Sequence, residues 1–318
     1  MVVFGLCLAG ASVMNVTLVS QARTALEEGI LGNRSVGTPL TYHVALIIPR
    51  TTDTFFDGLT EGVLVAARRI DAAVQIFRYQ AQAPNDLETY FQLGLSSHLD
   101  GLIVYSGLDQ MQNHRKQAEA EHVVFIPVGT RAPGGSGLFV GSSSFLQGVE
   151  GGNIAVRHRG SSARIGIVLP AEGEEEPRRD PMYRGILMTL NTFSGASIVA
   201  ASRANPGLFS GEEAVSSLLR AEPSINILIC GNAPITEGAA QVIVDQGLVG
   251  QVLLIGTDES PTIDKLVDRG VITASIVRDS RLVGEQAVKA FLRALRGGTS
   301  EPPVEVGFTV RERRESKR

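Results

Sequence analysis

The stretch HVALIIPRTTDTFFDGLTEGVLVAARRI, residues 43–70, contains the two patterns that decide the fold. Residues 43–48 form a short, nearly continuous apolar run, as expected of a strand buried on both faces of a parallel sheet. From Phe56 to Ile70, apolar residues recur at three- and four-residue spacing, which is typical of an amphipathic helix. The stretch therefore predicts a strand that leads into a helix.

The same alternation continues through most of the chain. Further short apolar runs, mostly separated by helical patterns, lie at residues 74–79, 102–105, 123–126, 138–141, 164–169, 197–201, 225–230, 252–256, 273–277 and 305–310. A regular β-α alternation implies right-handed crossovers and a doubly wound α/β sheet. Because the runs are many and break near residues 142–144, we expect two sheets and hence two lobes.

The composition limits the classes of partner. Of the 318 residues, 43% are hydrophobic, which allows a sizeable core, and the formal net charge is −4. This balance gives no electrostatic reason to expect nucleic acid or an anionic membrane surface as partner. Cys7 and Cys230 are the two cysteines, far apart in the sequence, and the five His residues show no metal-ligand spacing. The sequence therefore predicts no metal and no other cofactor.

The N-terminus carries no charged residue between Val2 and Ala22. This segment fits a signal peptide with Ser20-Gln21-Ala22 as a cleavage site, and it is also just long enough for an uncleaved membrane anchor. A buried helix of the fold is the alternative interpretation. We expect export, either cleaved or anchored, with residues 1–22 as the signal or anchor and residues 23–41 as a spacer.

Local signatures of catalysis are absent from the sequence. No Gly-x-Gly-x-x-Gly follows the first predicted strand, where Ile48 is followed by Pro49-Arg50-Thr51. The chain also lacks a Walker A loop and a Gly-x-Ser-x-Gly nucleophile elbow. An apolar α/β chain of this kind indicates a binding protein, and an enzyme on a Rossmann-like scaffold is the remaining alternative.

Several segments, in order, resemble the type I periplasmic sugar-binding proteins, which include the ribose- and galactose-type receptors of ABC transporters. They are VALIIPRTTDTFFDGLTEGVLVAARR, FIPVGTR, LFVGSSSFLQGVEGG, YRGILMTL, LICGNAPITEGAAQVI, VLLIGTDESPTIDKLVDRG and ITASIVRDSRLVGEQAVKAFLRAL. The ligand domains of lactose-repressor-like regulators share this fold. The resemblance covers about residues 42–310, nearly all of the part expected to fold.

The resemblance implies two Rossmann-like lobes with parallel sheets, joined by a hinge of three crossovers, with a ligand in the cleft between them. We expect the crossovers near residues 142–144, 278–279 and 299–302. The implied boundaries are 42–142 plus 279–299 for lobe one, 143–278 plus 300–312 for lobe two, and 313–318 for a basic tail.

Candidate ligand residues follow the predicted strands, because ligands of open α/β sheets bind beyond the carboxyl ends of the strands. In lobe one, Asp53 follows the first strand, although a helix N-cap is its alternative role. Phe55 and Phe56 match the family's aromatic pair, so we expect one in the core and one against a sugar ring. Arg131 matches the family's cleft arginine, but Thr130 stands where an acidic residue usually precedes it.

In lobe two, Phe209, Asn232 and Asp258 match the family's aromatic, amide and acid after successive strands, with helix capping as the alternative role of Asn232 and Asp258. Arg278 stands at the hinge, where ribose-type receptors often have Gln. Met182 replaces the family's second-lobe arginine, three residues before the Gly of YRG, and Arg178, Arg179 or Tyr183 are candidate substitutes. This departure argues against carrying over ribose or galactose as the ligand.

The sequence therefore predicts an extracytoplasmic solute-binding protein, located in the periplasm or at the cell surface. It would capture a sugar or sugar-like molecule by hinge closure and deliver it to an ABC importer or a membrane sensor. The alternative is a lactose-repressor-like transcription regulator. Such a regulator needs a DNA-binding helix-turn-helix before the first strand, and only 42 residues precede His43, beginning with an apolar run.

Overall fold

The computed structural model describes residues 40–81, 83, 85–105, 108–130, 138–171, 176–205, 209–297 and 302–313. The expected signal or anchor, nearly all of the spacer, Arg131 and the basic tail after Arg313 lie outside these residues. No helix within the described ranges is both long enough and apolar enough to cross a membrane.

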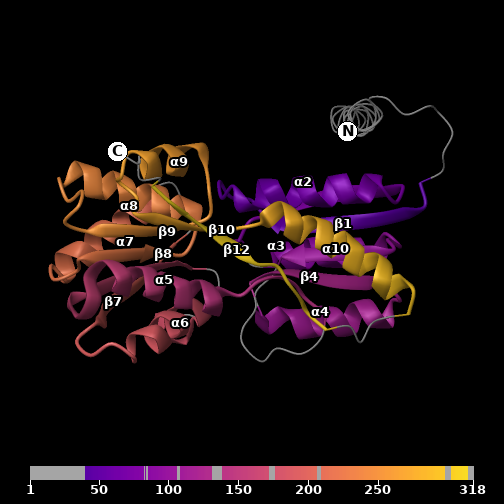
Figure 1. The fold of residues 1–318 in the computed structure, drawn as a ribbon. Helices are drawn as coiled ribbons and strands as arrows, with labels where there is room; N and C mark the ends of the chain where they lie inside the picture. Colours follow the sequence, from indigo (N-terminus) through magenta and orange to yellow (C-terminus); the bar gives the residue numbers. More distant parts are fainter. Residues whose placement is uncertain are drawn as a thin grey trace, which may run out of the picture. The chain divides into compact units, whose positions relative to one another are not determined.

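The first sheet has the strand order β11-β5-β4-β3-β1-β2, and Figure 1 labels its strands β1 and β4. Its strands are β1 (Tyr42–Pro49), β2 (Ala72–Tyr79), β3 (Gly101–Tyr105), β4 (Val124–Thr130), β5 (Val140–Ser142) and β11 (Val304–Glu305). Every neighbouring pair is parallel. The order reverses around β1, so the carboxyl ends of β1 and β3 lie side by side at one edge of this sheet.

The second sheet has the order β12-β10-β9-β8-β6-β7. Its strands are β6 (Arg164–Pro170), β7 (Ser197–Ala204), β8 (Ile227–Cys230), β9 (Leu253–Thr257), β10 (Ala274–Arg278) and β12 (Phe308–Glu312). The pairs are parallel except that β12 runs antiparallel to β10. Two parallel-dominated sheets confirm the predicted α/β fold with two Rossmann-like units.

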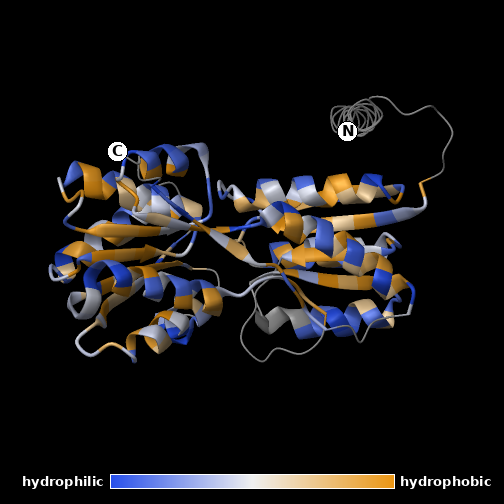
Figure 2. Cartoon of the chain, in the orientation of Figure 1, coloured by the Kyte–Doolittle hydropathy of each residue, from blue (hydrophilic) through white to orange (hydrophobic). Residues whose placement is uncertain are grey.

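Helices cover both faces of each sheet. On the first sheet α2 (Phe55–Arg68) and α10 (Ser280–Leu295) pack side by side, and α3 (Asp86–Ser96) and α4 (Leu108–Ala120) contribute to a separate core cluster. Successive side chains of strand β1 point into these two cores in turn. Leu46 and Ile48 belong to the core with α2 and α10, and Ile47 belongs to the core with α3 and α4. A strand buried on both faces has no polar side, which explains its continuous apolar run (Figure 2).

The second sheet is covered in the same way. Helices α5 (Ser144–Arg159) and α6 (Pro181–Leu190) share one core cluster, and α7 (Ser210–Ala221), α8 (Ala233–Asp245) and α9 (Pro261–Asp268) share the other. Short 3-10 turns, η1 (Gly160–Ser162) and η2 (Pro177–Arg179), precede β6 and α6. Below, lobe one is the first sheet with α2, α3, α4 and α10, and lobe two is the second sheet with α5 to α9.

The chain passes between the sheets at three places. It leaves β5 of the first sheet at Ser142 and enters α5, and it leaves β10 of the second sheet at Arg278 and enters α10. The third passage differs from the expectation, which assigned residues 300–312 to lobe two. Val304 and Glu305 pair with β5 in the first sheet, so this passage lies between Glu305 and Phe308.

The apolar run 305–310 is therefore two short strands rather than one. Val306 is buried in the core of lobe one, and its amide donates to the carbonyl of Gly141 at 2.8 Å. From Phe308 the chain pairs with β10 of lobe two. A local apolar pattern cannot show that the two halves of one run join different sheets.

Close contact between α2 and α10 depends on Gly62, and we predict that Gly62→Ala destabilises lobe one. A Cβ at this position would lie 2.0 Å from the backbone carbonyl oxygen of Arg281, which cannot move without shifting α10. Overpacking of this kind costs about 1–3 kcal/mol of unfolding free energy, measurable by urea denaturation.

Gly151→Ala on α5 is the matched control. There the nearest atom to a new Cβ is Ile229 Cδ1 at 3.5 Å, an ordinary van der Waals distance. Alanine favours the helix over glycine by up to about 1 kcal/mol, so this variant should be neutral or more stable. Equal stability of the Gly62 variant and the unsubstituted protein would contradict the close approach of the two helices.

Candidate functional site

A cavity lies at the carboxyl ends of strands from both sheets. Its volume is about 80 Å³, several times the roughly 10–15 Å³ that one water needs. Lobe one contributes Thr51, Asp53, Phe56 and Tyr105; lobe two contributes Ser144, Gln147, Leu169, Pro170, Asp180, Met182, Gly231 and Asn232; and Arg278 comes from the crossover after β10. One cavity is thus lined by side chains of both lobes.

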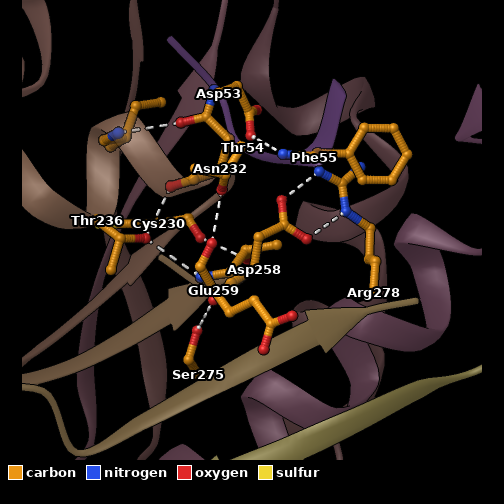
Figure 3. A network of polar contacts seen from close by, with 12 residues as sticks. Asp53, Thr54, Phe55, Cys230, Asn232, Thr236, Asp258, Glu259, Ser275 and Arg278 are labelled. Carbon is orange, nitrogen blue, oxygen red and sulfur yellow. Dashed lines mark hydrogen bonds and ion pairs between the residues drawn. The ribbon is translucent and has the colours of Figure 1, made fainter. Parts of the chain in front are cut away.

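Arg278 and Asp258 form a buried ion pair beside this cavity (Figure 3). The guanidinium Nε donates to Asp258 Oδ1 at 2.7 Å and Nη2 donates to Oδ2, so the contact is bidentate. The guanidinium carbon also lies 4.0 Å from the centre of the Phe55 ring, a cation–π distance. The pair thereby joins the end of β9, the end of β10 and the first residue of α2.

The charges around Arg278 determine its protonation. Burial alone would lower the pKa of Arg278, but the charges and hydrogen bonds around it, those of Asp258 above all, raise that pKa above its ordinary value. Asp53 and Tyr105 add smaller contributions in the same direction. Arg278 is therefore a permanent cation at the cavity.

The backbone of Asp258 is held in an uncommon conformation. Its φ is +66°, in the left-handed region that non-glycine residues seldom adopt. Its amide donates to Ile276 O at 2.9 Å, and Ser275 Oγ donates to its carbonyl, so β10 fixes the residue on both sides. Asp258 does not cap α9, since Ser260 does. The structure thus gives Asp258 the role of partner to Arg278.

Asp53 and Asn232 line the cavity from opposite lobes, and each also accepts a bond at the start of a helix. Phe55 N donates to Asp53 Oδ1 at 3.1 Å at the start of α2. Ile235 N donates to Asn232 Oδ1 at 3.0 Å at the start of α8. The capping bonds fix the orientation of both side chains, and the amide Nδ2 of Asn232 stays available to a ligand.

The aromatic pair divides its roles between core and cavity. Phe56 lines the cavity and packs edge-on against Tyr105, with ring centres 4.7 Å apart. Phe55 is buried, does not line the cavity, and lies under Arg278. Both rings belong to the buried core of lobe one, so the contact of one of them with a sugar ring stays a prediction. The position of Phe55 under Arg278 is a role that the sequence did not predict.

Among the described candidates, those that do not line the cavity are Phe55, Asp258 and Phe209. Phe209 is 72% exposed, precedes α7 with φ +68°, and is not among the lining residues. Arg131 lies outside the described residues and stays a prediction.

At the position of the family arginine, Met182 is buried and lines the cavity. None of Arg178, Arg179 and Tyr183 does so. The cation that approaches this region is Arg203 of β7, which donates to Pro170 O at 2.6 Å and to Asp180 Oδ2 at 3.1 Å.

Sequence reasoning missed several lining residues. Thr51 and Tyr105 follow or end strands β1 and β3, so the rule that found Asp53 would also have found them. Gln147 and Ser144 lie in the first turn of α5, and their approach to the cavity depends on how the first crossover turns. Gln147 is almost fully buried, and its Nε2 has no hydrogen-bond partner among the described residues. An unpaired buried amide hydrogen is costly unless a ligand or water accepts it.

Comparisons with known proteins agree with this fold. Residues 44–299 match a family model described as "Periplasmic binding protein domain". The D-allose-binding periplasmic protein of Escherichia coli (strain K12) is 22% identical in an alignment over 273 residues, which covers 81% of this chain and 86% of that protein.

Solved structures share the fold. An ABC transporter solute-binding protein from Burkholderia graminis C4D1M, in complex with D-arabinose, aligns with a TM-score of 0.77 and 19% identity, over 87% of this chain and 97% of that chain. A chain of a structure described as the XylFII-LytSN complex aligns with a TM-score of 0.75 and 20% identity, over 86% and 98%.

Removing one member of the buried ion pair should be strongly destabilising. Asp258→Ala leaves the Arg278 cation buried without its carboxylate, which costs about 3–5 kcal/mol of unfolding free energy. The double variant Asp258→Leu with Arg278→Met should recover most of that loss, because neither member of the ion pair is then buried without the other. Chemical denaturation of the unsubstituted protein, the single variant and the double variant measures their unfolding free energies.

Glu61→Ala is the control for a solvent-exposed pair. Arg281 Nη1 lies 3.2 Å from Glu61 Oε1, with both side chains more than half exposed. Such pairs contribute at most about 1 kcal/mol. A loss as small as this for Asp258→Ala would show that Asp258 is not the essential partner of Arg278.

Proposed function

Because its match to the family model spans residues 44–299, the chain belongs to the periplasmic binding protein domain family, and we propose that it captures a sugar or sugar-like molecule between its lobes. The observation that carries this proposal is the cavity, which polar side chains of both lobes line together. A polyhydroxylated ligand suits it, since hydroxyls both donate and accept hydrogen bonds. The sugar ligands named for the similar proteins support the same class.

Each lining group has a defined role in this proposal. The carboxylate of Asp53 accepts from ligand hydroxyls, and Asn232 Nδ2 and Arg278 donate to ligand oxygens. The face or edge of Phe56 packs against the C–H groups of the ring. Asp258 contributes by fixing the guanidinium of Arg278 through a bidentate contact. We keep Arg131 as a further candidate from the sequence.

We propose that the ligand acts by stabilising a closed arrangement of the lobes. A ligand that contacts both lobes binds the closed state more tightly and therefore shifts the population toward it. Thr54 Oγ1 of lobe one donates to Glu259 O of lobe two at 2.6 Å, a direct hydrogen bond between the lobes. Small-angle X-ray scattering should show a smaller radius of gyration after addition of a binding sugar. An unchanged radius at saturation would argue against closure.

The family supports a location outside the cytoplasmic membrane, with delivery of the ligand to an ABC importer or a membrane sensor. The XylFII-LytSN complex is the precedent for a protein partner. The regulator alternative gains no support from the periplasmic relatives. Fractionation of the tagged, full-length protein tests the location, and a wholly cytosolic product with an intact N-terminus would contradict it.

Binding is tested by a thermal-shift and calorimetry panel of pentoses, hexoses and their deoxy derivatives. A sugar at 100 times its Kd should add about 2.7 kcal/mol of stability. Asn232→Asp keeps the oxygen that caps α8 but removes the Nδ2 donor. It should therefore weaken affinity about 5- to 10-fold, the value of one hydrogen bond, with little change in Tm of the free protein.

Phe209→Ala is the control, because this side chain is exposed and away from the cavity. The affinity of this variant should stay within about two-fold of that of the unsubstituted protein. Such a change in binding free energy is smaller than the loss of one hydrogen bond would cause. If Phe209→Ala abolished binding and Asn232→Asp had no effect, the proposed site would be wrong.

A further inference from the structure

We propose that Gln147 binds the ligand directly, through a hydrogen bond from its side-chain amide to a ligand hydroxyl, an inference that rests on the proposed sugar-binding function. Gln147 lines the cavity from lobe two, in the first turn of α5. The residue is 1% exposed, and its Nε2 forms no hydrogen bond with any residue that the structure describes. The amide nitrogen is thus withdrawn from water without gaining a partner in the described part of the protein.

The start of α5 holds this side chain at the cavity. The backbone of Gln147 is hydrogen-bonded within the helix, since its amide donates to Ser143 O at 3.0 Å. Ser143 also caps the helix, because its Oγ accepts from Leu146 N at 3.2 Å. Helix α6 packs closely against this turn, where a Cβ at Gly148 would lie 2.1 Å from Met182 O. The side chain of Gln147 therefore stays at the cavity and away from bulk water.

The other polar side chains with which lobe two lines the cavity make their bonds elsewhere. Asp180 Oδ1 accepts from Met182 N at 2.9 Å. Asn232 Oδ1 accepts from Ile235 N at 3.0 Å. Half a turn about its last bond exchanges the nitrogen and the oxygen of the Gln147 amide, so the group can direct its hydrogens into the cavity. A sugar hydroxyl bound there can accept from them.

Stability and affinity should therefore respond to this amide in opposite directions. In the free protein an unpaired buried amide costs stability, because it has lost its hydrogen bonds to water. In the complex the same group forms a bond without further loss of hydration. Removal of the amide should leave the free protein equally stable or more stable, and it should weaken binding. A glutamine that bonds inside the protein would show the reverse.

Gln147→Met tests this, because it removes the amide and keeps a side chain of similar length. Calorimetry with D-allose, D-arabinose and the other pentoses and hexoses of the panel identifies the sugar that binds most tightly. Gln147→Met should weaken the affinity for that sugar about 5- to 10-fold, the value of one hydrogen bond. The Tm of the free variant should equal or exceed that of the unsubstituted protein.

Gln241→Met on α8 is the matched control. Gln241 is exposed, does not line the cavity, and donates from Nε2 to Asp245 Oδ1 at 2.8 Å. The chemical change is the same as at Gln147, but the affinity for the sugar should not change.

Monodeoxy analogues of the same sugar test whether the contact is direct. Removal of the hydroxyl that accepts from Gln147 should weaken binding to the unsubstituted protein. The same removal should cost Gln147→Met at least about five-fold less, because this variant has already lost the bond. A glutamine that acts only through the shape of the cavity would not single out one hydroxyl.

The outcomes distinguish the role of Gln147 from the proposed function. If Gln147→Met binds the sugar as tightly as the unsubstituted protein, or if no hydroxyl is singled out, the proposed function stands and Gln147 does not bind the ligand. A lower Tm of the free variant with unchanged affinity would assign the amide to the fold instead. If no sugar of the panel binds the unsubstituted protein, both the proposed function and the role of Gln147 are wrong.

Discussion

The buried contact between Arg278 and Asp258 is the constraint on which the site depends. Arg278 is the last residue of β10 and stands where the chain crosses from lobe two to lobe one. Its guanidinium contacts Asp258 in lobe two and the Phe55 ring in lobe one. A buried cation that lost Asp258 would remain desolvated without a counter-charge in contact with it. The strand ends, the crossover after β10 and the start of α2 are therefore positioned together, and the cavity forms among them.

Two side chains that line the cavity take part both in folding and in the proposed binding. Asp53 and Asn232 each use one oxygen to accept a bond at the start of a helix, which orients the rest of the group toward the ligand. A side chain fixed in this way loses less conformational freedom when the ligand binds, so less of the interaction energy is spent on ordering. In lobe two, Asp180 accepts from Met182 N and from Arg203 Nη2, which fixes the position of its carboxylate at the cavity.

The sequence predicts much of this arrangement, and the exceptions have physical causes. Strand-end position finds Asp53 and Asn232, because parallel strands bring their carboxyl ends to one edge, and the family resemblance adds Arg278. It cannot reveal that Asp258 pairs with Arg278, since this depends on the register of β9 and β10. The sequence does not predict Gln147 as a lining residue, because it lies on a helix whose path depends on the first crossover. The sequence predicts one strand over residues 305–310, because the local apolar pattern does not show that its two halves pair with different sheets.

The most direct test of the account is a crystal structure of the protein with the sugar that stabilises it most. The account predicts one sugar molecule in the cavity, within hydrogen-bonding distance of Asp53 from lobe one, Asn232 from lobe two and Arg278 from the hinge at the same time. A sugar bound outside the cavity, or one that contacts a single lobe, would contradict it.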